Sequence, residues 1–145
     1  MKTFRFKLQT LLDQRRRRED VLQVELAEII REEAKELNRL AELQSRRAEL
    51  QARRAKLERR NAAVELQMDE YAQALRDDIK VQHLTVDAVR ERLEAKRAEV
   101  LEAMKARKVI EALRDKQQRD YILAIARAEQ SMLDEMASLK HARAT

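Results

Sequence analysis

The chain contains neither glycine nor proline in its 145 residues. Sharp turns and phosphate-binding loops depend on the backbone freedom of glycine or on the fixed backbone angle of proline. A fold with many turns is therefore nearly excluded, and with it sandwiches, barrels, doubly wound sheets and nucleotide-binding loops. Alanine, leucine, glutamate, arginine, lysine and glutamine dominate the sequence, and these are the strongest helix formers. The sequence predicts long helices.

The composition also limits the chemistry of the chain. There is no cysteine, so disulfides, thiolate metal sites and cysteine nucleophiles are excluded, and imidazole occurs only at His83 and His141. Charged residues make up 41% of the chain and aromatic residues 3%, but recurring large apolar residues argue against disorder. No apolar run is long enough for a transmembrane helix, and the N-terminus lacks the apolar core of a signal peptide. We expect a cytoplasmic protein.

A heptad pattern predicts a coiled coil. Two rows of residues seven apart form the predicted seam: Leu43, Leu50, Leu57, Val64 and Tyr71 in one, and Leu40, Arg47, Arg54, Asn61, Met68 and Leu75 in the other. Followed toward the N-terminus, the same rows meet Glu33 and Glu36. Because the apolar residues shift to Ile30, Ala34 and Leu37, the pattern predicts a local stutter there.

The periodicity weakens near Asp77 and Asp78 and resumes after Thr85. Aspartate and threonine side chains compete with helical backbone hydrogen bonds and favour helix caps. We therefore expect one all-α domain over residues 1–145, built as an antiparallel coiled-coil hairpin of two long helices that is monomeric when free. Helix one is predicted over about 4–76, the turn over about 77–85 and helix two over about 86–140. The arms would span on the order of 100 Å.

Charge is unevenly distributed along the chain. Residues 1–18 hold seven basic side chains against Asp13, and residues 19–42 hold eight acidic side chains against three basic ones. Folding the hairpin about residue 82 would bring a basic stretch of helix one beside a basic stretch of helix two, with Arg54 near Ile110 and Arg107 near Leu57. We call the arginines of these two stretches the basic collar. It is interpreted either as a solvated surface or as a contact with an acidic partner. The collar comprises Arg46, Arg47, Arg53, Arg54 and Arg107.

The run Arg15–Arg18 is the densest positive spot in the sequence. In the same predicted register it lies at the open end of the hairpin, beyond the reach of helix two. It is interpreted as a solvated helix face, a contact for an acidic protein surface, or a nucleic-acid contact.

No pattern in the sequence indicates catalysis. A two-helix rod offers no dry cleft for preorganised groups, adjacent carboxylates point apart on a helix, and no zinc or calcium spacing occurs. We therefore expect no enzymatic activity, no cofactor and no metal. The general alternatives are a structural coiled coil that self-dimerises as parallel helices, and a basic helix that binds nucleic acid. DNA binding is not expected, because acidic residues interrupt the basic stretch and no aromatic residues are interleaved for stacking.

Both ends of the chain resemble the flagellar export protein FliJ family. The N-terminal motif consists of Phe4, Phe6, Leu8, Leu11, Leu12 and Arg15, and the C-terminal motif of Tyr121, Arg127, Glu129, Gln130, Leu133, Asp134 and Glu135. The resemblance covers the whole chain, and the stalk proteins of virulence type III secretion systems are a related alternative. The family implies a small antiparallel coiled coil of the flagellar type III export apparatus, similar to the central stalk of rotary ATPases.

The resemblance also implies partners and a location. They are the hexameric export ATPase FliI, which the stalk binds and stimulates, the export-gate protein FlhA, and export chaperones that the protein escorts. The location is the cytoplasm, at the cytoplasmic face of the inner membrane within the apparatus. Tyr71 and Leu75 would contact the gate. The residues that would face the ATPase are Phe4, Phe6, Leu8, Leu12, Arg15, Arg16, Arg17, Arg18, Tyr121 and Arg127.

Overall fold

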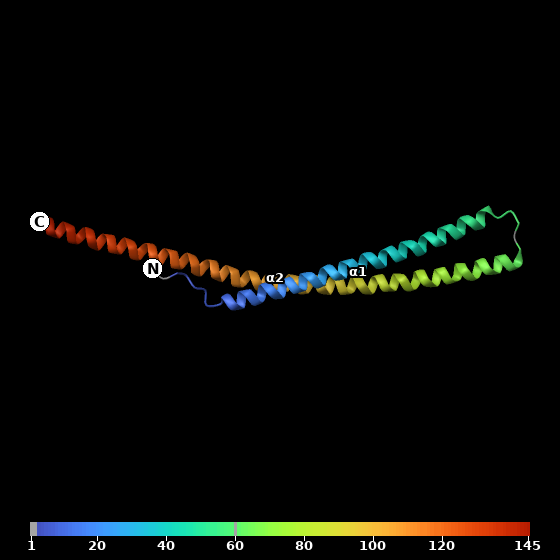
Figure 1. Ribbon diagram of the computed structural model, residues 1–145, viewed down its shortest axis with the longest axis horizontal. Coiled ribbons are helices and arrows are strands. Elements are labelled where there is room, and N and C mark those ends of the chain that lie inside the picture. The colour runs from blue at the N-terminus through green and yellow to red at the C-terminus, as the bar shows by residue number, and fades with distance from the viewer. Residues whose placement is uncertain (1–2, 60) are drawn as a thin grey trace. The chain divides into compact units, whose positions relative to one another are not determined.

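The computed structural model describes residues 3–59 and 61–145 and contains two α-helices there, with no strand in these ranges (Figure 1). Helix α1 spans Gln9–Lys56 and helix α2 spans Ala62–Ala144. Cross-helix pairs run in opposite directions along the two helices, from Arg54 with Asp69 to Glu25 with Lys96. The all-α helical hairpin predicted from the sequence is confirmed.

The connection between the helices lies at residues 57–61, of which residue 60 falls outside the described residues. Asn61 caps α2, because its side-chain oxygen accepts a hydrogen bond from the backbone N–H of Ala63 at 3.0 Å. Its carbonyl accepts the first helical bond, from Glu65 N–H at 2.9 Å. Asparagine is among the best N-cap residues, so it can start a helix without glycine or proline nearby.

The prediction of a turn at 77–85 is wrong, and so are the helix boundaries that depended on it. Helix α2 runs through these residues without interruption. Asp77 accepts a hydrogen bond from Gln73 at 3.0 Å, and the Thr85 hydroxyl donates to the Val81 carbonyl at 3.2 Å. Both bonds span four residues along one helix face, so these polar side chains are accommodated within the helix.

The described residues divide into two compact units, and each is described by itself. The first, here called the hairpin unit, comprises residues 21–100. Its core has two apolar clusters, each with residues from both helices. The cluster nearer the connection contains Leu40, Leu43, Leu50, Leu75 and Ile79, and the other contains Ile29, Val89 and Leu93.

A polar stretch separates the two clusters of the hairpin unit. Glu36 keeps the phase of the heptad seam and accepts hydrogen bonds from buried Gln82, while Glu33 pairs with Arg90. Ile30 remains 45% exposed. The predicted stutter is therefore wrong: the seam continues in register, and polar pairs across the helices replace apolar packing there.

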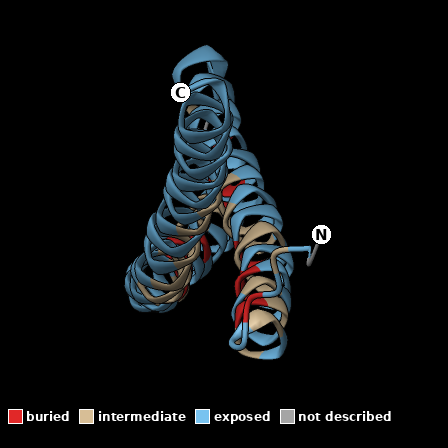
Figure 2. Cartoon of the chain, turned by 90° about the vertical axis from the view of Figure 1, so that its left-hand side faces the viewer, coloured by how far each residue is buried: buried red, intermediate tan, exposed pale blue. Residues whose placement is uncertain are grey.

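The second unit, here called the terminal unit, comprises described residues 3–20 together with 101–145. Residues 3–8 precede α1 and pack without regular secondary structure, and Gln9 N–H donates to the Phe6 carbonyl at 3.2 Å. Leu12 is fully buried and Phe6 nearly so. After Ile125 every residue of α2 is exposed, as the C-terminal end of that helix shows in Figure 2. That residues 1–145 form a single domain stays a prediction.

Candidate functional site

The aromatic residues of the two chain ends meet in the terminal unit. The rings of Phe4 and Tyr121 lie with their centroids 5.6 Å apart and tilted by 46°, a favourable arrangement for an aromatic pair. Leu8 is 38% exposed, whereas Leu12 has no exposed surface. The sequence-predicted contact residues thus include both surface and core positions, and Leu12 supports the packing beneath the surface.

The four arginines of the run Arg15–Arg18 have different surroundings. Arg16 donates to Glu111 of α2, with its Nη2 at 3.3 Å from the carboxylate. The Nε of Arg17 donates to the carbonyl of Asp13 at 3.4 Å. Arg15 and Arg18 are exposed and have no ion-pair partner among the described residues. The prediction that helix two does not reach this run is wrong for Arg16.

Arg16 belongs to a network of alternating charges within the terminal unit. Glu111 accepts from Arg16 through one oxygen and from Arg107 through the other, the latter at 2.8 Å. Arg107 in turn makes a bidentate contact with buried Glu19. The hydrogen bond to Glu19 raises the pKa of the Arg107 guanidinium above its ordinary value. The network joins α1 and α2 and keeps both carboxylates paired.

The register that defined the basic collar is wrong. Arg107 contacts Glu19 instead of lying near Leu57, and Arg54 pairs with Asp69 instead of lying near Ile110. The remaining collar residues, Arg46, Arg47 and Arg53, are exposed side chains of α1 in the hairpin unit. The physical reason is the position of the connection, because a turn at 57–61 pairs each α1 residue with a different part of α2 than a turn at 77–85 would.

The two residues expected to contact the export gate differ in how far their side chains are exposed. Leu75 is 3% exposed and belongs to the core cluster beside the connection. Tyr71, one helical turn earlier, is 48% exposed. Of the two, only Tyr71 has its side chain at the protein surface.

The C-terminal part of α2 exposes a row of large apolar side chains. Arg127 is exposed among them and has no ion-pair partner in the described chain. Three of these apolar residues, Met132, Met136 and Leu139, are each more than 60% exposed. Helix α1 and the preceding segment do not cover them, because the helices differ in length by 35 residues, 83 in α2 against 48 in α1.

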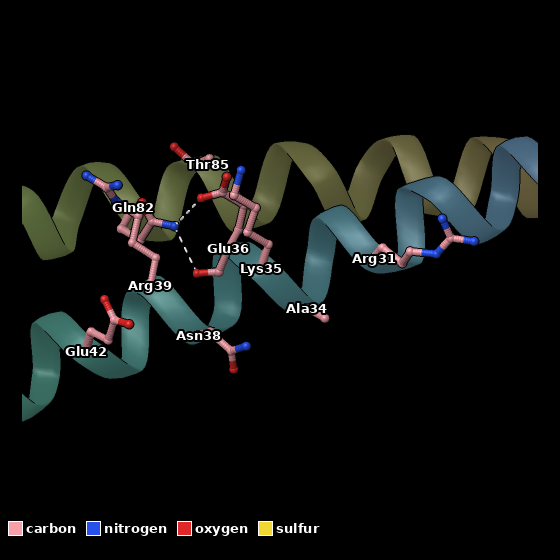
Figure 3. Close-up of a pocket in the computed structure, with 9 residues that line it drawn as sticks. All are labelled: Arg31, Ala34, Lys35, Glu36, Asn38, Arg39, Glu42, Gln82 and Thr85. Atoms are coloured by element: carbon pink, nitrogen blue, oxygen red, sulfur yellow. Dashed lines mark hydrogen bonds between the residues drawn. The ribbon is translucent and has the colours of Figure 1, made fainter.

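A groove along the hairpin unit was not recognised from the sequence. Its volume is about 820 Å³, and it lies beside the Gln82–Glu36 contact. Figure 3 shows the amide of Gln82 directed toward Glu36, with Lys35 and Arg39 extending from α1 on either side. The available sequence signal was a row of basic residues four apart on one helix face. The lining residues are Arg31, Ala34, Lys35, Glu36, Asn38, Arg39, Glu42, Gln82 and Thr85.

Within residues 3–59 and 61–145, no group of three or more histidine, aspartate or glutamate side chains is placed to hold a metal ion. In the same ranges no helix has the length and apolar character needed to cross a membrane.

Comparison with known proteins identifies the family. The profile described as "Flagellar FliJ protein" matches residues 4–145, nearly the whole chain. Searches of curated proteins and of solved structures found no significant match. The family is one of components of the flagellar export apparatus. Because the match covers nearly the whole chain, including both helices, the chain belongs to the flagellar FliJ protein family.

Proposed function

We propose that this protein is a non-enzymatic stalk of the flagellar export apparatus that binds and stimulates the hexameric ATPase FliI. The observation that carries the proposal is the contact between Phe4 and Tyr121. The family resemblance assigned both residues to the ATPase-facing end. This contact lies in the unit that also carries exposed Arg15 and Arg18, which supports a composite surface there.

The four arginines then divide into two groups. Arg15 and Arg18 lie three residues apart, on neighbouring positions of one helix face, and are free to meet carboxylates of the ATPase. Arg16 is engaged with Glu111 and acts within the protein. Replacing all four would therefore mix a binding defect with a packing defect.

The test is ATP turnover by FliI with and without this chain. We expect stimulation that saturates well below one chain per ATPase subunit, as one stalk per ring requires. The double variant Arg15→Glu and Arg18→Glu should lose stimulation while its circular dichroism stays unchanged. A matched variant, Lys108→Glu and Lys116→Glu, changes two exposed basic residues of the same unit and should stimulate normally.

Two results would contradict the proposal. If the Arg15 and Arg18 variant stimulates FliI normally, these two residues do not contribute to the ATPase contact. If the folded wild-type protein does not stimulate FliI, the proposed stalk function is refuted.

The same proposal includes a contact with FlhA, the escort of export chaperones and a cytoplasmic location at the inner membrane. We assign the gate contact to Tyr71, whose ring is exposed, because Leu75 is in the core. Tyr71→Ala should weaken capture of FlhA without changing ATPase stimulation. Unchanged capture would mean that the gate binds elsewhere.

A further inference from the structure

The basic groove of the hairpin unit lies in the most acidic stretch of the sequence. Residues 19–42 contain eight acidic and three basic side chains. The structure distributes these charges unevenly around α1, because several acidic side chains turn toward α2. All three basic side chains, Arg31, Lys35 and Arg39, line the groove.

Three of the acidic side chains that face α2 form ion pairs with it, and a fourth, Glu36, accepts hydrogen bonds from a neutral amide. Lys96 Nζ lies 2.8 Å from Glu25, and Arg92 Nη1 lies 2.9 Å from Glu32. Arg90 pairs with Glu33 at 3.5 Å. Glu36 accepts hydrogen bonds from the Gln82 amide through its carboxylate at 2.6 Å and through its carbonyl at 2.9 Å.

The basic side chains of the groove have no such partners. Arg31, Lys35 and Arg39 are exposed, and none has an ion-pair partner within residues 3–59 and 61–145. Of the other lining residues, Glu42 supplies one carboxylate and Glu36 a second, which accepts a hydrogen bond from the Gln82 amide, while Asn38 and Thr85 supply neutral polar groups. Cross-helix pairing therefore leaves a basic surface on a segment whose sequence is acidic.

We propose that this groove binds an acidic amphipathic helix of a partner protein. Arg31, Lys35 and Arg39 recur every four residues, which spaces them by about 6 Å along the helix axis. Carboxylates every four residues on a partner helix have the same spacing, so each can meet one cation. A helix lying in a groove between two helices is a common mode of peptide recognition.

Exposed apolar side chains one helical turn from lining residues support a helix as the occupant. Ala34 lines the groove, and Ile30, one turn earlier on α1, is 45% exposed. On α2, Val81 lies one turn before Thr85 and is 62% exposed. An amphipathic helix can cover these apolar side chains while its acidic edge meets the three cations.

The same features argue against other occupants. Single-stranded nucleic acid is bound on stacked aromatic side chains, and the lining contains none. A second copy of this chain is a poor source of the acidic helix, because Glu25, Glu32, Glu33 and Glu36 are already paired within each copy. The inference is independent of the ATPase contact, which involves the terminal unit.

The test is fluorescence anisotropy with a labelled, stapled helical peptide as the probe. The peptide carries glutamate at every fourth position beside a leucine row, and a matched peptide has glutamine in place of each glutamate. The triple variant Arg31→Gln, Lys35→Gln and Arg39→Gln should bind the acidic peptide about tenfold more weakly, as expected for the loss of three exposed ion pairs. The control variant Lys80→Gln, Lys116→Gln and Lys140→Gln has the same net charge and should bind like wild type.

Thermal melts of both variants establish that they are folded before binding is compared. The glutamine peptide should bind wild type no better than it binds the triple variant. The proposal is overturned if no acidic peptide binds, if both variants bind equally, or if glutamine and glutamate peptides bind alike. The proposal is also overturned if a DNA duplex binds wild type more tightly than the peptide does and binds the triple variant more weakly. In that case the groove binds nucleic acid.

Discussion

Gln82 is expected to be a main determinant of hairpin stability and register. Its amide donates two hydrogen bonds, one to the carbonyl and one to the carboxylate of Glu36. A hydrogen bond to a neutral acceptor contributes about 1 kcal/mol, and one to a charged acceptor about 1.5–3 kcal/mol. Because Glu36 is only half-buried, the lower part of the second range applies.

These values predict an order among three variants. Gln82→Ala removes both bonds and should lower the free energy of unfolding by about 2.5–3 kcal/mol. Glu36→Ala keeps the carbonyl bond and should cost about 1.5–2 kcal/mol. Gln82→Leu donates no bond but buries apolar surface, which offsets about 1.5–3 kcal/mol of the loss. It should therefore lie within about 1.5 kcal/mol of wild type.

Urea denaturation followed by circular dichroism measures all three free energies. A cost below about 1 kcal/mol for Gln82→Ala, or an equal cost for Glu36→Ala, would refute the assignment of the two bonds. A second experiment tests the helix register separately from stability. It uses introduced cysteine pairs, which can be cross-linked specifically because the chain has no native cysteine. A bismaleimide should cross-link Glu32→Cys to Arg92→Cys, and in the Gln82→Leu background it should also cross-link Glu32→Cys to Glu99→Cys, one heptad away. Cross-linking of the first pair alone in that background would show that Gln82 does not set the register.

Two further predictions concern the core and the ion pairs. Leu12→Ala should cost about 2–5 kcal/mol because Leu12 is fully buried. Leu8→Ala, at a partly exposed site, should cost less than about 1 kcal/mol, and equal urea midpoints would contradict this packing. Hydrogen bonding to Glu25 raises the pKa of Lys96 above its ordinary value of 10.5. Since the folded-state pKa is the higher one, the pair stabilises the protein fully below pH 10.5 and loses this contribution as the pH rises further. The melting temperature of wild type should therefore approach that of Lys96→Met above this pH, and a constant difference would exclude the pair as a source of stability.

The sequence predicted the fold class because its signals are repeated along the chain. Absence of glycine and proline, helix-forming composition and heptad rows all indicate the same two-helix hairpin. The N- and C-terminal motifs gave the family. The contact between Phe4 and Tyr121 joins two residues that the family resemblance assigned to the same face.

The position of the connection could not be predicted in the same way. A break in a long helix is set by a few residues, and Asn61 fits a heptad row as readily as a cap. Asp77 and Thr85 are typical of a turn or helix cap, yet their side chains form hydrogen bonds within α2. This one error changed the register, and with it the surroundings of Arg54 and Arg107.

The partners of charged residues in the seam could not be predicted from the sequence either. A charged residue such as Glu36 only interrupts an apolar row until the residue opposite it on the other helix is known. Once the register places Gln82 opposite, the same residue becomes a specific contact. The groove follows from that pairing, so it could not be derived from either helix alone.

The placement of the connection also has a consequence for how the chain folds. Cross-helix contacts occur at sequence separations of 15 for Arg54 with Asp69, 46 for Gln82 with Glu36 and 71 for Lys96 with Glu25. The separation reaches 95 for Arg16 with Glu111. Each contact, once made, shortens the loop that the next must close, so folding should proceed as a zipper that starts at the Asn61 cap. The aromatic pair at the termini would form last, and pulsed hydrogen exchange that protected the terminal unit first would rule out this order.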